Sequence, residues 1–333
     1  MTSRLNILNP RLAEQILLMD GAMGTMIQQE GLSEEDFRGA SYRDHPIPLQ
    51  GNHDILCLTQ PALIQKIHDS FLGAGSDIIE TNTFNSTSIS QGDYGLSDSI
   101  YAINKAAAEL AREVADSWTS RTPDKPRFVA GAIGPTNLSL SMSPDVSNPG
   151  YRASTFDQVA ASYAEQIEGL LAGGVDILLA ETIFDALNSK AAIFAMYDVF
   201  RRRQTWCPVM ISGTIVDQSG RTLSGQSIEA FWNSIAHAPH LISVGLNCAL
   251  GSEQMRPYLE TLSGVANVCT SLYPNAGLPN EFGEYDETAG FMAEQIADYA
   301  NEGLLNIVGG CCGTTPEHIS AMAEATSSCE PRT

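Results

Sequence analysis

The sequence predicts a single α/β domain built as a (β/α)8 TIM barrel, in which eight parallel strands alternate with helices. Three observations lead to this prediction. Eight short apolar runs recur along the chain, helical patterns lie between most of them, and glycines end several helices just before the next run. An open doubly wound sheet is the alternative, because it is assembled from the same repeating unit.

The apolar runs are rich in Val, Ile and Leu, which is typical of strands buried on both faces of a parallel sheet. The runs span residues 15–25, 76–84, 127–136, 175–184, 208–215, 241–249, 268–276 and 305–313. Chemistry in parallel α/β folds takes place at the carboxyl ends of the strands. The polar residues at these ends are Asp20, Glu80 with Thr83, Glu181, Asn247 with Cys248, and Cys311 with Cys312.

Each helix between the runs is expected to begin at a polar cap. The expected caps are Thr59, Thr155 and Thr315. Pro61 and Pro316 suit a first helical turn, and Gln158 completes a capping box with Thr155. His318, in the first turn of the last helix, is expected at the surface. The helices before the second, fourth and eighth runs are expected to end at Gly75, Gly174 and Gly303.

Two connections are much longer than the usual ~2–6 residues. They cover residues 28–54 and 137–154. Long loops after barrel strands often build the site, so both are expected near it. No linker divides the chain, which predicts one domain over residues 1–333 with its core at about 11–325.

The composition argues against several classes of protein. The chain has 18 Lys and Arg against 39 Asp and Glu, a net charge of −21, and its one basic run, 201–203, is expected at a solvated helix end. Nucleic acid is therefore not an expected partner. No run approaches the ~18 apolar residues of a membrane span, and no signal peptide is evident. With seven scattered cysteines, these features predict a protein of the reducing cytoplasm.

Three cysteines stand at strand ends that a barrel would bring together. Cys248 ends the sixth run, and Cys311 and Cys312 end the eighth. Three thiolates around one ion, with a fourth position open, are a catalytic zinc arrangement. Adjacent cysteines on a regular strand point to opposite faces, so both can face one ion only where the backbone is irregular. The glycines that permit unusual dihedrals there are Gly309, Gly310 and Gly313.

Two other interpretations of this segment remain open. The paired cysteines could form a redox dithiol or a vicinal disulfide. The glycine-rich turn before the last helix could bind phosphate, as turns after the last strands of such barrels often do. The remaining cysteines are expected to be small buried hydrophobes; they are Cys57, Cys207, Cys269 and Cys329.

Seven longer segments resemble the homocysteine-binding region of cobalamin-dependent methionine synthase, within the homocysteine S-methyltransferase family. They are LMDGAMGTMIQ (18–28), SDIIETNTFNSTS (76–88), VAGAIGPTN (129–137), ISGTIVDQSGRTLSGQ (211–226), GLNCALG (245–251), YPNAGLPN (273–280) and VGGCCGTTPEHI (308–319). GLNC with GGCCG is common to the wider family, including betaine- and S-methylmethionine-dependent members. The longer blocks are closer to the cobalamin enzyme.

The resemblance implies a zinc ion on Cys248, Cys311 and Cys312. It also implies a set of substrate-binding residues: Asp20, Gly21, Ala22, Thr83, Glu181 and Asn247. The backbone of Gly21 and Ala22 would receive the homocysteine carboxylate, and Glu181 the amino group. The residues alone leave simpler roles open, since Asp20 could cap a turn and Glu181 could pair with a cation.

The implied activity is activation of homocysteine as a zinc thiolate and methyl transfer from methylcobalamin, with 5-methyltetrahydrofolate as the ultimate donor, to form methionine. The cobalamin-binding motif Asp-x-His-x-x-Gly is absent, so cobalamin is expected on another module. The family enzyme's folate, cobalamin and reactivation domains are likewise not in this chain, which is expected to be a fragment or a partner in trans of such modules. A stand-alone methyltransferase using betaine or S-methylmethionine, and a non-catalytic homocysteine- or zinc-binding module, remain alternatives.

Overall fold

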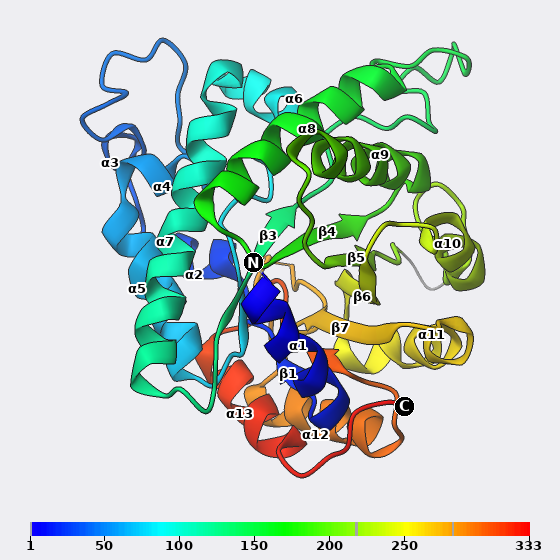
Figure 1. Ribbon diagram of the computed structural model, residues 1–333. Coiled ribbons are helices and arrows are strands. Elements are labelled where there is room, and N and C mark those ends of the chain that lie inside the picture. The colour runs from blue at the N-terminus through cyan, green and yellow to red at the C-terminus, as the bar shows by residue number, and fades with distance from the viewer. Residues whose placement is uncertain (1, 217–218, 282) are drawn as a thin grey trace.

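Eight parallel strands form the centre of the molecule in the computed structural model, which describes residues 2–216, 219–281 and 283–333 (Figure 1). The strands are β1 (Leu17–Leu18), β2 (Ile78–Glu80), β3 (Phe128–Ile133), β4 (Ile177–Ile183), β5 (Val209–Gly213), β6 (Leu241–Gly251), β7 (Cys269–Asn275) and β8 (Ile307–Val308). Each lies within, or largely within, one of the eight apolar runs. The sequence therefore locates every strand of the sheet.

The sheet closes on itself. Its strand order is β1-β8-β7-β6-β5-β4-β3-β2, and a parallel bridge between Met19 and Ile78 joins its two ends. Two hydrogen bonds reinforce this closure: the Asp77 amide donates to the Leu18 carbonyl, and the Leu18 amide donates to Asp77 Oδ2 (2.7 and 3.0 Å). The predicted (β/α)8 barrel is confirmed, and an open sheet is excluded.

Helices surround the strands (Figure 1). They are α1 (Thr2–Glu14), α2 (Met23–Gln29), α3 (Glu34–Arg38), α4 (Leu56–Thr59), α5 (Pro61–Gly73), α6 (Ser88–Gln91), η1 (Gly92–Tyr94), η2 (Ser97–Ser99), α7 (Ile100–Arg121), α8 (Phe156–Gly173), α9 (Ala186–Arg203), α10 (Ile228–Ile235), α11 (Ser252–Val265), α12 (Ala289–Asn301) and α13 (Pro316–Thr326). The glycines expected before β2, β4 and β8 all have positive φ. The arginine run ends α9 and is exposed, as expected.

Helix starts were predicted with mixed success. The capping box of Thr155 and Gln158 is present in α8. The Thr59 cap is wrong, because Thr59 ends α4 and Gln60 precedes α5. The surface position of His318 is also wrong: the ring is 9% exposed, because it pairs with the Thr315 cap and its Nε2 bonds the Glu287 carbonyl at 2.9 Å.

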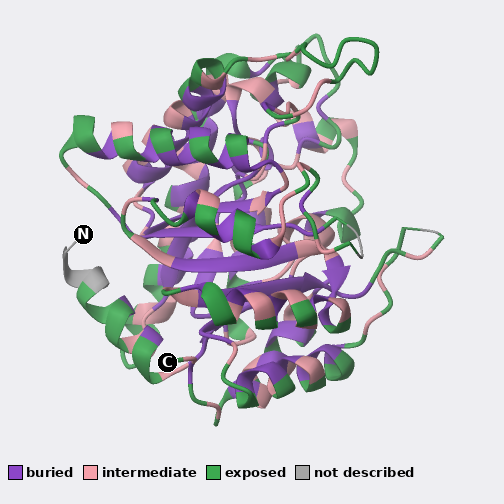
Figure 2. Ribbon diagram, turned by 90° about the vertical axis from the view of Figure 1, so that its right-hand side faces the viewer, coloured by how far each residue is buried: buried purple, intermediate pink, exposed green. Residues whose placement is uncertain are grey.

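The core has two parts, and Figure 2 shows the buried strands between helices whose outer faces are exposed. A large cluster fills the space between sheet and helices. A smaller one fills the barrel and includes Ile177 and Leu179 of β4. Leu8 and Leu12 of α1 belong to this inner cluster, although α1 precedes the first strand. No pattern in the sequence predicted this helix.

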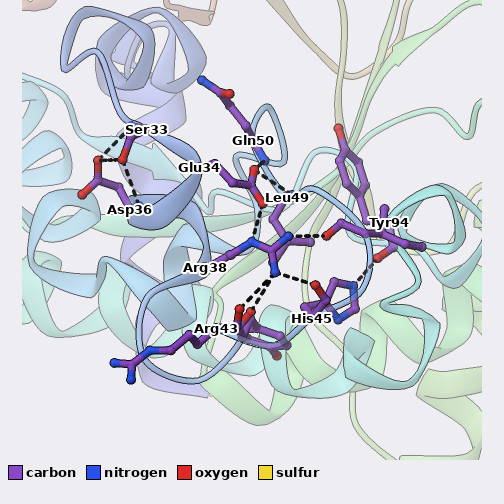
Figure 3. A network of polar contacts seen from close by, with 11 residues as sticks. Ser33, Glu34, Asp36, Arg38, Arg43, His45, Leu49, Gln50 and Tyr94 are labelled. Carbon is purple, nitrogen blue, oxygen red and sulfur yellow. Dashed lines mark hydrogen bonds and ion pairs between the residues drawn. The ribbon is translucent and has the colours of Figure 1, made fainter.

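The long loop 28–54 is held together from within by α3 (Figure 3). Arg38 donates to four backbone carbonyls of the loop, those of residues 42, 43, 45 and 47. Glu34 accepts from Arg38 Nε and from the amides of Leu49 and Gln50. Burying or fixing loop backbone requires such partners. The backbone of loop 28–54 is therefore held in one conformation by its own side chains.

Within the described residues, no helix combines the length and apolar character needed to cross a membrane.

Candidate metal and substrate site

The three predicted cysteines meet at the carboxyl end of the barrel. The Sγ atoms of Cys248, Cys311 and Cys312 all lie within 4.8 Å of one another, and the Cys248–Cys312 pair is 3.9 Å apart. Two sulfurs each ~2.3 Å from one tetrahedral zinc would be roughly 3.8 Å apart. The separation and the soft ligand type both fit a zinc ion.

Cys248 reaches this point because β6 is irregular at its end. The pairing of β6 with β7 shifts register between Asn247 and Gly251. Within this bulge Cys248 and Ala249 have left-handed φ values of 61° and 62°. Non-glycine residues in that region cost of order 1–3 kcal/mol each and are concentrated at functional sites. This conformation turns the Cys248 side chain away from the direction it would have on a regular strand. Glycine would adopt the same φ without strain, but it has no sulfur to offer as a ligand.

Cys311 and Cys312 are held by backbone hydrogen bonds to β7. The Cys311 amide donates to the Pro274 carbonyl (2.7 Å), and the Cys312 amide donates to Asn275 Oδ1 (3.1 Å). Thr314 Oγ1 donates to the Cys311 carbonyl (2.6 Å). These three hydrogen bonds fix the turn that carries Cys311 and Cys312 without any bound ligand.

The surrounding glycines serve two purposes. Gly313 has a φ of +81°, so it supplies the unusual dihedral that was predicted. Gly309 and Gly310 are required for space instead. A Cβ at Gly309 would lie 2.7 Å from Met19 Cβ, and one at Gly310 would lie 2.5 Å from Thr314 Oγ1.

The three thiols hold one negative charge among them. Hydrogen bonds from Cys248 and Cys311 lower the pKa of Cys312 to about 3. A hydrogen bond with Cys311 favours the Cys248 thiolate, but the bond to Cys312 and burial outweigh it and raise the pKa of Cys248 to about 12. Hydrogen bonds to its two neighbours raise the pKa of Cys311 well above its usual range. A divalent cation would be needed for all three to ionise.

Three carboxyl groups lie beside the sulfurs at the ends of β1, β2 and β4. Asp20 and Glu181 are 3% and 5% exposed, and Asp20 Oδ2 accepts from the Glu80 amide (3.0 Å). Burial raises the pKa of Glu80 to about 7, partly offset by a hydrogen bond from Glu181. Burial, followed by the charge of Glu80, raises the pKa of Glu181 strongly. No ion pair to these three carboxyls is found among the described residues, so the site suits an incoming ammonium group.

Strand geometry explains why two of these acids are neighbours. Side chains two residues apart on a strand share a face. Ile78 lies in the barrel interior and Glu80 follows on that face, just as Glu181 follows Leu179. The Tyr273 side chain, 2% exposed, also belongs to the interior, and the charges of Glu181 and Glu80 add to burial in raising the pKa of its hydroxyl. Glu80 was recognised as a strand-end acid but not as a site residue.

The other predicted substrate contacts have protein partners of their own. The Ala22 amide donates to Thr314 Oγ1 (3.1 Å). Thr83 Oγ1 donates to the Ala132 carbonyl (2.7 Å). Asn247 Oδ1 accepts from the Thr182 amide (3.0 Å) and from Ser212 (2.7 Å). Asn247 thereby ties β4 and β5 to the strand that carries Cys248. Substrate roles for these residues and for Gly21 remain predictions.

Tyr285, which follows β7, is a further residue of the site that was not predicted from the sequence. Its side chain lies beside Cys312 and, after the hydrogen bonds from Cys248 and Cys311, helps to lower the pKa of that thiol. The charges of all three cysteines act on Tyr285. The tyrosine comes five residues after the YPNAGLPN segment, and nothing in its local pattern distinguishes it from a loop aromatic.

Comparison with known proteins places this geometry in context. The sequence model of the homocysteine S-methyltransferase family matches residues 17–326. Crystal structures of the homocysteine methyltransferase MmuM from Escherichia coli share the fold. Its metallated form is 23% identical with a TM-score of 0.72, covering 96% of this chain and 98% of that one. The oxidised form is 23% identical with a TM-score of 0.69, covering 93% and 95% of the two chains.

Proposed function

This chain belongs to the homocysteine S-methyltransferase family, and on that premise we propose that it activates homocysteine as a zinc thiolate for methyl transfer to form methionine. The proposed donor is methylcobalamin, with 5-methyltetrahydrofolate as the ultimate source of the methyl group. One observation supports the metal-dependent chemistry above all: three cysteine sulfurs from two strands lie within 4.8 Å of one another, beside three carboxyl groups.

The cysteines and the acids divide the work. Cys248, Cys311 and Cys312 would hold the zinc ion, which when bound supplies a Lewis acid that favours the thiolate form of the substrate. Glu181, with Glu80 and Asp20 near it, would receive the substrate ammonium. The proton that now joins Glu181 to Glu80 would leave when that cation binds. The amino acid would thus be oriented by its amino group with its sulfur toward the cysteines.

A donor panel tests the proposal. The zinc-loaded protein would be incubated with homocysteine and, in separate reactions, methylcobalamin, S-methylmethionine or betaine, and methionine would be measured. If methylcobalamin gives methionine, the proposed donor is supported. If only S-methylmethionine or betaine gives methionine, that compound is the donor and methylcobalamin is rejected. Homocysteine and zinc binding with no methionine from any donor would indicate a non-catalytic binding module and overturn the proposal.

The cysteine variants provide the matched control. Replacing Cys248, Cys311 or Cys312 by Ala should abolish zinc retention and turnover while the far-ultraviolet circular dichroism is unchanged, because the ligands lie on strand ends outside the main core. Cys329→Ala, outside the cluster, should keep zinc and activity. Full zinc content in the three ligand variants would refute the metal site. The cobalamin- and folate-binding modules as partners, and a cytoplasmic location, remain predictions.

A further inference from the structure

We propose that Tyr285 is a positioning residue of the metal site, which holds and tunes the Cys312 sulfur through a hydrogen bond from its hydroxyl. The inference rests on the proposed metal site and goes beyond it, because it assigns a role to a residue that binds neither metal nor substrate directly. Three features of the chain around Tyr285 carry it, together with the charge of a three-thiolate site.

The segment that bears Tyr285 is fastened to Cys312 itself. After β7 the Ala276 amide donates to the Cys312 carbonyl (2.9 Å). The chain then leaves and returns, and the Glu287 amide donates back to the Ala276 carbonyl (3.0 Å). An antiparallel bridge between Pro279 and Tyr285 spans the two arms. Tyr285 is therefore presented by a short hairpin-like loop whose base is bonded to the metal-ligand turn.

The ring of Tyr285 packs directly on Gly313. A Cβ placed on Gly313 would lie 2.3 Å from Tyr285 Cβ and 2.5 Å from its Cγ, a separation that real atoms do not adopt. Glycine at 313 thus admits the tyrosine as well as supplying a positive φ. The sequence predicted only a metal-binding role for the GGCCG segment. Its last glycine also contacts the aromatic ring of Tyr285.

The Tyr285 side chain lies near the sulfurs. After burial, the groups that raise the pKa of its hydroxyl are Cys312, Cys248 and Cys311, so the proposed bond runs from this hydroxyl to Cys312. Tyr285 is half-buried, so this bond is only partly exposed to competition from water. A hydrogen bond to an ionised acceptor is roughly twice as strong as a neutral one.

The chemistry of a three-thiolate site explains the need for such a donor. Three thiolates and one divalent ion leave an excess negative charge, and a substrate thiolate adds another. A donor to one ligand sulfur disperses part of this charge and fixes the sulfur's orientation without adding a ligand. Partners of this kind typically contribute about 10- to 100-fold to metal affinity or activity.

The test uses the full chain with Tyr285→Phe, which keeps the ring on Gly313 and removes only the hydroxyl. Tyr101→Phe, on the exposed face of α7, is the matched control. Each protein would be loaded with cobalt(II), and its thiolate-to-cobalt charge-transfer band recorded. Loss of the hydrogen bond raises the energy of the sulfur lone pair, so the band of Tyr285→Phe should move to longer wavelength. Zinc affinity, measured against a chromophoric chelator, should fall about 10-fold or more.

The outcomes separate this inference from the proposed function. If the wild-type protein shows a cysteine-dependent cobalt band that Tyr285→Phe leaves in place, and both proteins hold zinc equally, the role of Tyr285 is refuted and the metal site stands. If the wild-type protein binds neither metal, the metal site is refuted and the role of Tyr285 with it. A band shift and a loss of affinity confined to Tyr285→Phe support the inference.

Discussion

Glu80 and Glu181 form a pair of carboxyl groups whose titration depends on each other. The proton of Glu181 is donated to Glu80, and both pKa values are raised, chiefly by burial. Two adjacent buried carboxylates cannot both ionise without a compensating cation. In the metal-free and substrate-free protein the pair therefore carries a proton near neutral pH. An ammonium ligand that binds between the two carboxyl groups would displace this proton.

The first prediction concerns the pH dependence of stability. The pKa of Glu80 is about 7 in the folded protein against an ordinary value of 4.5, so the folded state binds more protons between these values. Stability due to this group is thus present below about pH 4.5 and is lost as pH rises through 7. Because glutamine does not titrate, Glu80→Gln removes this pH-dependent loss of stability. Relative to wild type, the metal-free variant should gain about 1 kcal/mol or more in free energy of unfolding between pH 5 and pH 8.

Urea unfolding of both proteins at the two pH values measures this difference. Glu317→Gln, an exposed acid in the first turn of α13, is the control and should show no such gain. Equal stability differences at pH 5 and pH 8 for Glu80→Gln would show that Glu80 does not hold a proton in the folded state.

The second prediction concerns substrate recognition. Glu181→Gln removes a charge that would pair with the homocysteine ammonium, and a hydrogen bond to a charged group is worth about 1.5–3 kcal/mol. Homocysteine affinity measured by calorimetry should fall at least ~10-fold, while zinc content stays near that of the wild type. Unchanged homocysteine affinity would reject the role assigned to Glu181.

At the scale of elements, the two long loops share one construction. In loop 137–154, Arg152 donates to the carbonyls of Leu140, Ser141, Pro149 and Tyr151, and Asp185 at the start of α9 accepts from the Ser141 amide. Arg38 and Glu34 do the same in loop 28–54. In each loop an arginine donates to several backbone carbonyls and an acid accepts from backbone amides, and these bonds order loop backbone that lies outside helices and strands.

The third prediction tests this construction. Arg38→Ala leaves several loop carbonyls without their donor, so residues 39–50 should exchange amide hydrogens faster, and limited proteolysis should cut there first. The global unfolding transition should change little, because Arg38 bonds other residues of the loop, whereas the loop's core residues Phe37 and Leu49 are kept. Arg201→Ala, at the exposed end of α9, should leave the exchange of residues 39–50 unchanged. If residues 39–50 of Arg38→Ala exchange amide hydrogens as slowly as in the wild type, Arg38 does not hold this loop in place.

Some elements were predictable because their signals are local. The capping box at Thr155 and the glycines before β2, β4 and β8 act within a few residues of themselves, and the structure confirms them. The cap at Thr59 failed because α4, a single helical turn, precedes it and was not anticipated. The last strand was predicted over nine residues, whereas only Ile307–Val308 form the strand; the Gly309 amide completes the ladder at the Leu272 carbonyl, and the Gly310 amide bonds the Asp20 carbonyl.

At the scale of the whole molecule, α1 closes one end of the barrel. Leu8 is 1% exposed and contacts the interior cluster, whereas Ile7 beside it is 41% exposed. The other end holds the cysteines and carboxyl groups. One end of the barrel is therefore devoted to stability and the other to the site, as in other barrels of this class.

The fourth prediction follows from that division. Leu8→Ala should lower the free energy of unfolding by about 2–5 kcal/mol, because a buried leucine is replaced by a cavity. Ile7→Ala, its exposed neighbour, should change it by less than about 0.5 kcal/mol. Urea denaturation followed by circular dichroism measures both. Similar effects of the two substitutions would show that α1 does not cap the barrel.

The sequence by itself determined the barrel, the place of its strands and the three cysteines at their ends, because apolar periodicity and strand-end polarity are written locally in the chain. Only the tertiary structure decided that Glu80 and Glu181 are neighbours, that Tyr285 lies beside Cys312, and that Leu8 packs into the interior cluster. These are contacts between residues distant in sequence or on separate elements. Their energies depend on burial and separation, which exist only once the chain has folded.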